Sequence, residues 1–322
     1  MARRTASTVT VTILAALATV AAGCTMFEDD YTPGSLPIPE ETDIAYGLSR
    51  GCNVESPGSD EDCGGSQELD IYRSEQDGPN PIVVFIHGGG FVGGDKGWGV
   101  NEYFGELLDE GWDIAAVNYR LSTDDGQNRW PVPLQDVKQA VRWIKANAED
   151  QDWDANRVAA IGHSAGGNLA ALLATTADEP ALEPTELAPP LQEVDSSVVA
   201  GISLRGVTDL RLYADSPFGE PVPTYLGCTD CPDVLAAGSV QPYVDENSSP
   251  VLATYGADDP IAPAEQGEKL RAAFAEAGIE DRFRLIVVDD GPKKFRSHEP
   301  DVKRFIGDYI DFIEDAVDES AV

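Results

Sequence analysis

One serine stands between glycines in GHSAG, residues 162–166, after the apolar run RVAAI and before the alanine-rich run NLAALLATTA. If the first run is a strand and the second a helix, the pentapeptide is the sharp turn between them, with Ser164 at its apex. Such a serine can attack a carbonyl carbon, and the helix after it directs free amide groups at the reaction centre. On its own, the pattern is equally consistent with a tight packing contact.

Three consecutive glycines end the motif HGGG, residues 87–90, which follows the apolar run PIVVFI. Glycines in a row are unfavourable unless the backbone must adopt positive φ or approach another group closely. We expect the amides of Gly89, Gly90 and Ala165 to form an oxyanion hole, in which each donor typically contributes roughly a hundredfold or more in rate. A phosphate-binding loop is the alternative, but the Lys and Ser or Thr of a P-loop do not follow.

Acyl transfer by a serine requires a base, and the sequence contains three histidines. His87 opens the glycine motif and His163 adjoins Ser164 on the turn, so neither ring can easily face the serine hydroxyl. His298 follows the strand-like run FRLIVV and precedes a last helical segment. We therefore expect His298 to be the general base, a role that commonly contributes roughly 10²- to 10⁴-fold in rate. A surface histidine is the alternative.

The elements that must position these residues are apolar runs alternating with helical patterns. Strand-like runs lie at 69–72, 81–86, 112–119, 157–161, 198–204, 250–255 and 283–288. Several lack polar alternation, as is typical of parallel strands covered on both faces. Helical stripes lie at 132–150 and 301–317. The alternation predicts an α/β fold with a mostly parallel, doubly wound sheet.

Two irregular insertions interrupt this alternation, at 177–197 and 207–249. The first is rich in Glu and Pro, and the second contains aromatic residues and a CxxC motif. Long loops above the carboxyl ends of strands carry the substrate pockets of such folds, so we expect both segments to form a cap.

The segments HGGGFVGGDK, NYRLS and GHSAGGNLAALLA together resemble the α/β-hydrolase superfamily, over roughly residues 65–316. The resemblance is to its HGGG-bearing carboxylesterase and lipase branch, and most of all to bacterial esterases akin to acetyl-xylan esterases and kynurenine formamidases. In this superfamily the triad runs Ser, Asp, His in chain order. The resemblance implies that Asp259, in GADDPIAP, orients the base, with Asp258 as the alternative that would cap the turn.

The N-terminus has the pattern of an export signal. Arg3 and Arg4 precede an uncharged, mostly apolar run that ends in AAGC. The small residues before Cys24 resemble the bacterial lipoprotein cleavage box, which implies removal of residues 1–23 and lipidation of Cys24. An ordinary secretory signal and a twin-arginine signal are the alternatives. We expect the protein to lie outside the cytoplasm, anchored to the membrane by lipid.

The segment after Cys24 is acidic and proline-containing, so residues 24–43 are expected to be a tether. The folded domain is expected at 44–318.

Four cysteines remain when Cys24 is set aside, and an even number suits an oxidising compartment. Sequence proximity favours disulfides between Cys52 and Cys63 and between Cys228 and Cys231. A four-thiolate zinc site is the alternative, but the sequence has a single CxxC motif.

The charge balance argues against nucleic-acid binding, because 22 basic and 57 acidic residues give a net charge of −35. We expect a serine hydrolase that cleaves small-molecule or polysaccharide esters of small or medium acyl groups, without a metal or organic cofactor. A peptidase, an arylformamidase and a catalytically silent binding protein of the same fold are the alternatives.

Overall fold

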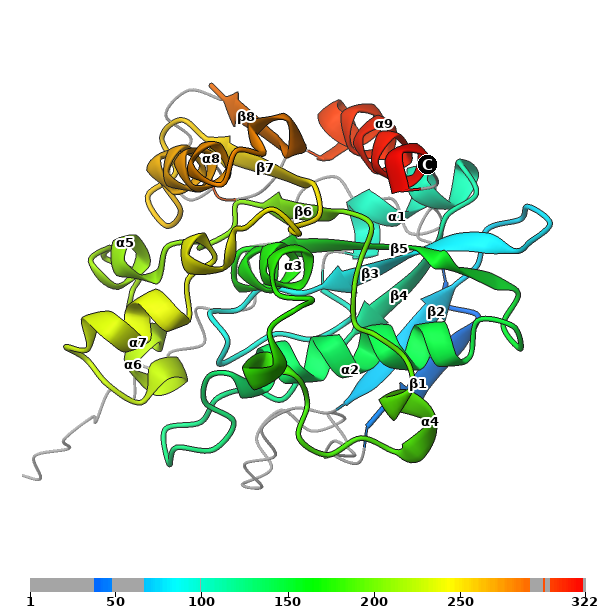
Figure 1. The fold of residues 1–322 in the computed structure, drawn as a ribbon, viewed down its shortest axis with the longest axis horizontal. Coiled ribbons are helices and arrows are strands. Elements are labelled where there is room, and N and C mark those ends of the chain that lie inside the picture. Colours follow the sequence, from blue (N-terminus) through cyan, green and yellow to red (C-terminus); the bar gives the residue numbers. More distant parts are fainter. Residues whose placement is uncertain (1–37, 48–66, 99, 290–297, 299–301, 321–322) are drawn as a thin grey trace, which may run out of the picture. The chain divides into compact units, whose positions relative to one another are not determined.

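The computed structural model describes residues 38–47, 67–98, 100–289, 298 and 302–320 (Figure 1). Within these residues the central element is an eight-stranded sheet. Its strands are β1 (Glu41–Ala45), β2 (Glu68–Tyr72), β3 (Asn80–Ile86), β4 (Asp113–Val117), β5 (Trp153–His163), β6 (Gly201–Leu204), β7 (Val251–Gly256) and β8 (Phe283–Val288).

The strands lie in the order β1-β2-β4-β3-β5-β6-β7-β8. β2 pairs antiparallel with both β1 and β4, and every pairing from β4 to β8 is parallel. In β3, for example, Val84 lies opposite Ala115 of β4 and Ala160 of β5. The predicted α/β fold with a mostly parallel sheet is confirmed.

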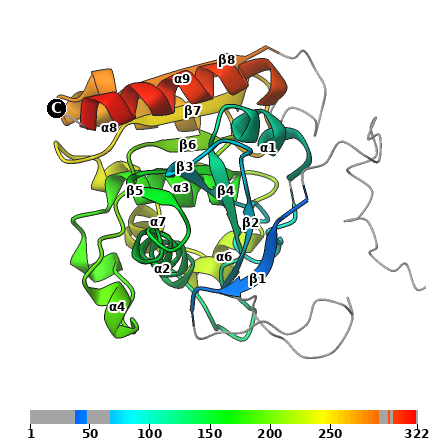
Figure 2. The same ribbon diagram turned by 90° about the vertical axis from the view of Figure 1, so that its right-hand side faces the viewer.

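Helices cover both faces of the sheet (Figures 1 and 2). They are α1 (Val100–Asp109), α2 (Val132–Ala146), α3 (Ala165–Thr175), α4 (Pro189–Gln192), α5 (Leu210–Ala214), α6 (Pro221–Leu226), α7 (Pro232–Ala237), α8 (Glu265–Glu276) and α9 (Val302–Ser320). Short 3-10 turns lie at η1 (Pro180–Leu182), η2 (Gln241–Tyr243) and η3 (Glu280–Arg282).

The central strands read as continuous apolar runs because both of their faces are buried. In β3, Val84 and Ile86 pack into the core under α2, α3 and α8. Val83 and Phe85 point the other way, into the core under α1 and α9. The parallel pairing of β3 with β5 sets Ile86 opposite Gly162, so the two strands end side by side, just before the glycine motif and Ser164.

The expected insertion at 177–197 packs along α2. The Glu183 carboxylate accepts a hydrogen bond at 2.6 Å from the fully buried Nζ of Lys138 and is also paired with Arg142. The segment follows α3, which runs from the elbow toward the amino ends of the strands, so it emerges at the end of the sheet opposite to Ser164. Its place therefore differs from the cap that we expected.

The insertion at 207–249 instead follows the carboxyl end of β6 and contains α5, α6 and α7. Trp130 donates its amide to the Tyr225 carbonyl at 2.9 Å, and the Phe91 and Tyr225 rings stack at 3.8 Å. These contacts place the second insertion beside Phe91, the residue that follows the glycine motif.

The folded domain begins before the expected residue 44. Glu41 in β1 already pairs with Ile71, and the Glu40 amide donates to the Ile71 carbonyl at 2.8 Å. The boundary of the tether was therefore placed too late, because pairing to an edge strand needs no long apolar run. The signal segment 1–23 and most of the tether lie outside the described residues. Among the described helices, none is long and apolar enough to cross a membrane.

Candidate active site

Ser164 occupies a strained turn between β5 and α3. Its φ of 55° and ψ of −115° lie in a region that non-glycine residues rarely adopt. Its amide donates to the Leu204 carbonyl at 2.9 Å, and the residue is 7% exposed. Strain of this kind persists only where the surroundings impose it, and it is common at functional sites.

The surroundings that impose this conformation are backbone contacts at glycine positions. A Cβ at Gly162 would overlap the carbonyl of Gly166, and a Cβ at Gly166 would overlap the carbonyl of Ile86 at the end of β3. A Cβ at Gly167 would lie 2.8 Å from the Cα of Gly206. The first turn of α3 thus packs directly on the backbone of its neighbours, which only glycine permits.

The glycine motif lies beside Ser164. A Cβ at Gly88 would lie 3.2 Å from the Cβ of Ser164. Gly89 and Gly90 adopt φ values of 113° and 63°. Within the described part of the chain, the amides of Gly89, Gly90 and Ala165 donate to no other residue. Three donors are therefore available next to the serine, as an oxyanion hole requires.

Asp259 and His298 form a hydrogen-bonded pair. The Nδ1 of His298 lies 2.8 Å from the Oδ2 of Asp259, whose side chain is fully buried. The Oδ1 of Asp259 accepts hydrogen bonds from the backbone amides of Ile261 at 2.8 Å and Ala262 at 3.0 Å. Asp258 is exposed. The carboxylate that faces the imidazole is therefore that of Asp259, and the turn after β7 holds it in place.

His163 links His298 to the serine elbow. Its Nε2 lies 3.0 Å from the backbone carbonyl of His298, and the two rings are 5.1 Å apart. Burial, and after it the neighbouring His298, lowers the pKa of His163 to about 3. The ring is therefore neutral at physiological pH and donates its Nε2 proton to that carbonyl.

His87 packs against the backbone of the glycine motif. Its ring stacks on Tyr119 at 4.4 Å, and its Nδ1 lies 2.7 Å from the Gly88 carbonyl. Burial lowers the pKa of His87 to about 4, and the hydrogen bond to Gly88 only partly opposes this shift. Both His87 and His163 are thus held in contacts that fix the backbone around the serine.

Two cap residues that the sequence did not single out lie over the glycine motif. A Cβ at Gly90 would lie 2.8 Å from the Cγ of Pro221 in α6 and 3.4 Å from the hydroxyl of Tyr213 in α5. The only signal in the sequence was that both fall in an irregular insertion after a late strand. Which of its residues reach the site depends on the fold of the insertion itself.

Cys228 and Cys231 form a disulfide bond, with their Cα atoms 6.2 Å apart. Neither sulfur is then a thiolate that could bind zinc. In the described part of the chain, no cluster of three or more His, Cys, Asp or Glu residues could hold a metal ion. Cys24, Cys52 and Cys63 lie outside the described residues.

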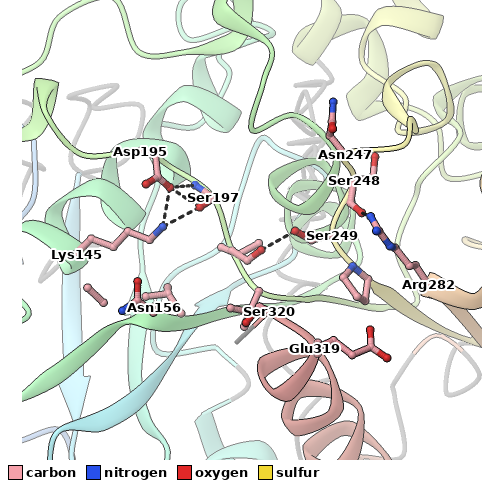
Figure 3. A pocket seen from close by; sticks show the side chains of 16 residues that line it. Lys145, Asn156, Asp195, Ser197, Asn247, Ser248, Ser249, Arg282, Glu319 and Ser320 are labelled. Carbon is pink, nitrogen blue, oxygen red and sulfur yellow. Dashed lines mark hydrogen bonds and ion pairs between the residues drawn. The ribbon is translucent and has the colours of Figure 1, made fainter. Parts of the chain in front are cut away.

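A pocket of about 420 Å³ lies at the amino ends of β5 to β8 (Figure 3). Ser164 and the glycine motif lie at the opposite, carboxyl ends of the strands. It is lined by Lys145, Ser197, Ser249 and Arg282, among others. Both cations are engaged, Lys145 by Asp195 and Ser197, and Arg282 by two backbone carbonyls. In parallel sheets of this kind, ligands bind at the carboxyl ends of the strands, so this pocket is not the candidate active site.

Residues 69–274 match the family model described as BD-FAE. The chain belongs to this family. Among curated proteins, it is 29% identical over 218 residues to the esterase LipQ of Mycobacterium tuberculosis, covering 65% of this chain and 50% of LipQ. It is 31% identical over 221 residues to the esterase LipC of the same organism, covering 64% of this chain and 53% of LipC. The chain thus spans about half the length of these relatives.

Solved structures share the α/β-hydrolase fold. A truncated carbohydrate esterase from gut microbiota superposes with a TM-score of 0.72 at 22% identity, covering 90% of this chain and 99% of that one. A bifunctional GH43-CE protein of Bacteroides eggerthii has a TM-score of 0.69 at 27% identity, covering 85% of this chain and 38% of that one. At 22% identity, the similarity to the truncated carbohydrate esterase shows a shared fold and nothing about activity.

The low pKa of His163 predicts a specific loss of stability in acid. Because the pKa is about 3 in the folded protein and near 6.5 in the unfolded chain, only the unfolded state gains this proton between those values. The contribution of neutral His163 is full above pH 6.5 and is lost as the pH falls. We expect the free energy of unfolding of His163→Gln to fall by about 1 kcal/mol less than that of the wild type between pH 6 and pH 5.

Urea unfolding at both pH values measures this difference. Equal losses in the two proteins would show that His163 is solvated enough to accept a proton in the folded state.

Proposed function

We propose that this protein is a serine hydrolase that cleaves carboxylic esters of small or medium acyl groups. The observation that carries the proposal is the 2.8 Å pair of Asp259 and His298, which His163 ties to the strained elbow of Ser164. The amides of Gly89, Gly90 and Ala165, which donate to no residue in the described ranges, support the same site. These observations support Ser164 as nucleophile, His298 as base, Asp259 as orienting acid and the three amides as oxyanion donors, all after the carboxyl ends of strands of one sheet.

In the proposed mechanism, the Ser164 hydroxyl attacks the ester carbonyl while the Nε2 of His298 takes its proton. The resulting oxyanion accepts hydrogen bonds from the amides of Gly89, Gly90 and Ala165. The intermediate then collapses, and His298 protonates the departing alcohol, leaving an acyl group on Ser164. A water molecule, deprotonated by His298, attacks this acyl-enzyme, and the acid leaves with the serine restored.

Asp259 acts through His298. Its Oδ2 accepts the Nδ1 proton of the imidazole, so that Nε2 is the unprotonated nitrogen when the serine must be activated. The negative charge also stabilises the imidazolium that forms during each half-reaction. No metal or organic cofactor has a part in this sequence of steps.

The comparisons support ester chemistry over the alternatives. The curated relatives LipQ and LipC are named esterases, and the two structural neighbours described above are carbohydrate esterases or contain a CE module by their titles. A peptidase, an arylformamidase and a silent binding protein of this fold are then outcomes that activity assays must distinguish.

We also propose that the protein is exported, with lipidation at Cys24, a tether, and a disulfide between Cys52 and Cys63. The support is the sequence pattern before Cys24 and the disulfide between Cys228 and Cys231, since such bonds persist in oxidising compartments.

Replacing the nucleophile should abolish ester hydrolysis. We expect Ser164→Ala to lower kcat for p-nitrophenyl acetate by on the order of 10⁴-fold or more, because no neighbouring group can form the acyl-enzyme. Steady-state assays of wild type and variant measure this, with melting temperatures to show that both are folded. Equal rates in the two proteins would rule out the proposed nucleophile.

The two adjacent aspartates provide a matched pair of variants. In Asp259→Asn, the side-chain oxygen can still accept hydrogen bonds from the backbone amides of Ile261 and Ala262. The NH₂ group that then faces His298 cannot accept a hydrogen bond from its Nδ1. We expect kcat to fall by on the order of 10³-fold or more. Asp258→Asn, at an exposed position, should change kcat by less than about twofold. Assays on the same ester measure both, and the reverse ranking would assign the orienting role to Asp258.

A further inference from the structure

The short helix α6 lies over the glycine motif. A Cβ at Gly90 would lie 2.8 Å from the Cγ of Pro221, the first residue of α6, and Gly90 is buried. Ser164, beside the same motif, is 7% exposed. The space directly over Gly90, one of the proposed oxyanion donors, is therefore filled by α6.

Tyr225 attaches α6 to the rest of the fold. Its ring stacks on that of Phe91, with the ring centroids 3.8 Å apart and the planes within 5° of parallel. The Trp130 ring meets it edge-on at 6.2 Å, and the Trp130 amide donates to the Tyr225 carbonyl at 2.9 Å. Aromatic pairs in these two geometries are favourable, so they hold α6 against the residue that follows the glycine motif.

The same side chain carries a penalty in this position. Tyr225 is fully buried, and its hydroxyl has no hydrogen-bond partner among the described residues. By contrast, the buried hydroxyls of Tyr119 and Tyr255 donate to backbone carbonyls at 3.2 and 2.9 Å. Burying an unpaired hydroxyl is unfavourable, and water relieves the cost when it reaches the group. The closed position of α6 is thus both held and opposed by Tyr225.

The packing of the second insertion, residues 207–249, is incompletely paired at two further places. Both polar side-chain atoms of Gln241 are buried without a partner in the described part of the chain. The Nδ2 of Asn168 in α3 donates to the carbonyls of Val207 and Gly238 at 3.1 and 3.3 Å, but its Oδ1 accepts from no described group. Such atoms lower the cost of local opening, and moving elements come from the less stable parts of a fold.

The start of the insertion is nevertheless fixed. The Asp209 amide donates to the Oε1 of Gln266 in α8 at 2.5 Å, and the Nε2 of Gln266 donates back to the Asp209 carbonyl at 3.1 Å. The Val240 amide donates to the Thr208 carbonyl at 2.9 Å, which ties the far part of the insertion to its start. At the end of α6, Gly227 has a φ of 76°, a conformation that favours glycine. Movement is therefore expected in α6 and the turns beside it.

We propose that α6 is a gate over Gly90, which opens to admit the alcohol part of an ester and closes through the stacking of Tyr225 on Phe91. The unpaired hydroxyl of Tyr225 limits the stability of the closed state, so that the gate can open. The movement itself is independent of the proposed esterase function, whereas its effect on catalysis rests on that function. Tyr225 acts on access to the site and takes no part in the proton transfers.

Tyr225→Phe tests the gate, because it keeps the stacked ring and removes only the hydroxyl. We expect a higher melting temperature, and about tenfold slower hydrogen exchange of the Gly227 amide, the effect of removing one unpaired hydroxyl from the closed state. This amide donates to the Pro223 carbonyl at 2.8 Å and so reports on α6. Hydrogen exchange followed by mass spectrometry or NMR measures the rate.

Two acetate esters test the effect on access. In Tyr225→Phe, we expect kcat/KM to fall about tenfold for 1-naphthyl acetate, whose alcohol is bulky, in step with the slower opening of α6. For methyl acetate, whose alcohol is small, kcat/KM should change by less than about twofold.

Tyr243→Phe is the matched control, because the Tyr243 hydroxyl is paired with the Ala237 carbonyl at 2.8 Å. This variant loses a hydrogen bond, so its melting temperature should fall, and exchange at Gly227 should not slow. Phe91→Leu removes the stack and should have the opposite effect to Tyr225→Phe, with exchange at Gly227 faster by about threefold or more.

The remaining outcomes contradict the gate. A lower melting temperature or unchanged exchange in Tyr225→Phe would show that the hydroxyl does not oppose the closed state. Slower exchange with unchanged kcat/KM on both esters would show that α6 opens without controlling access, and equal losses on both would place the effect at the reacting centre. Inactivity of the wild type on both esters would contradict the proposed esterase function, whereas the exchange rates would still test the movement.

Discussion

The structure of the site depends on one close contact, the packing of the first turn of α3 on the carboxyl end of β3. Gly166 lies against the carbonyl of Ile86, and Gly162 lies against the carbonyl of Gly166. With the helix this close, the chain can leave β5 only through a sharp turn, and Ser164 takes a positive φ. The same contact brings Ser164 beside Gly88, so the proposed nucleophile and the glycine motif with the proposed oxyanion donors are positioned together.

The proposed base, His298, is held from two sides. Asp259 binds the Nδ1 of His298, and His163 binds its backbone carbonyl. Asp259 is in turn fixed by two amides of the turn after β7. Because these partners come from the ends of β5 and β7, the position of the imidazole follows from the register of the central strands. Groups that are already held in position in this way can stabilise a charged intermediate without first having to reorganise.

Much of this could be predicted from the sequence, because the relevant signals are local. Continuous apolar runs predicted the parallel strands, and the glycines of HGGG and GHSAG predicted positive φ and close backbone approach, as found at Gly89, Gly90 and Gly166. The position of 177–197 could not be predicted, since it depends on the pairing of Lys138 with Glu183 across 45 residues. The pairing of strand β1 with β2 and the contact of Tyr213 with Gly90 likewise depend on the tertiary structure, and no local sequence pattern predicts them.

In the proposed mechanism Ser164 carries the acyl group between the two half-reactions, and trapping this covalent intermediate tests that role. Rapid acid quenching of the protein with excess p-nitrophenyl acetate, followed by proteolysis and mass spectrometry, would locate the acetyl group. We expect one acetyl group, on Ser164, and none in Ser164→Ala treated in the same way. Ester turnover with no acylated peptide, or acetylation at another residue that matches the turnover rate, would contradict it.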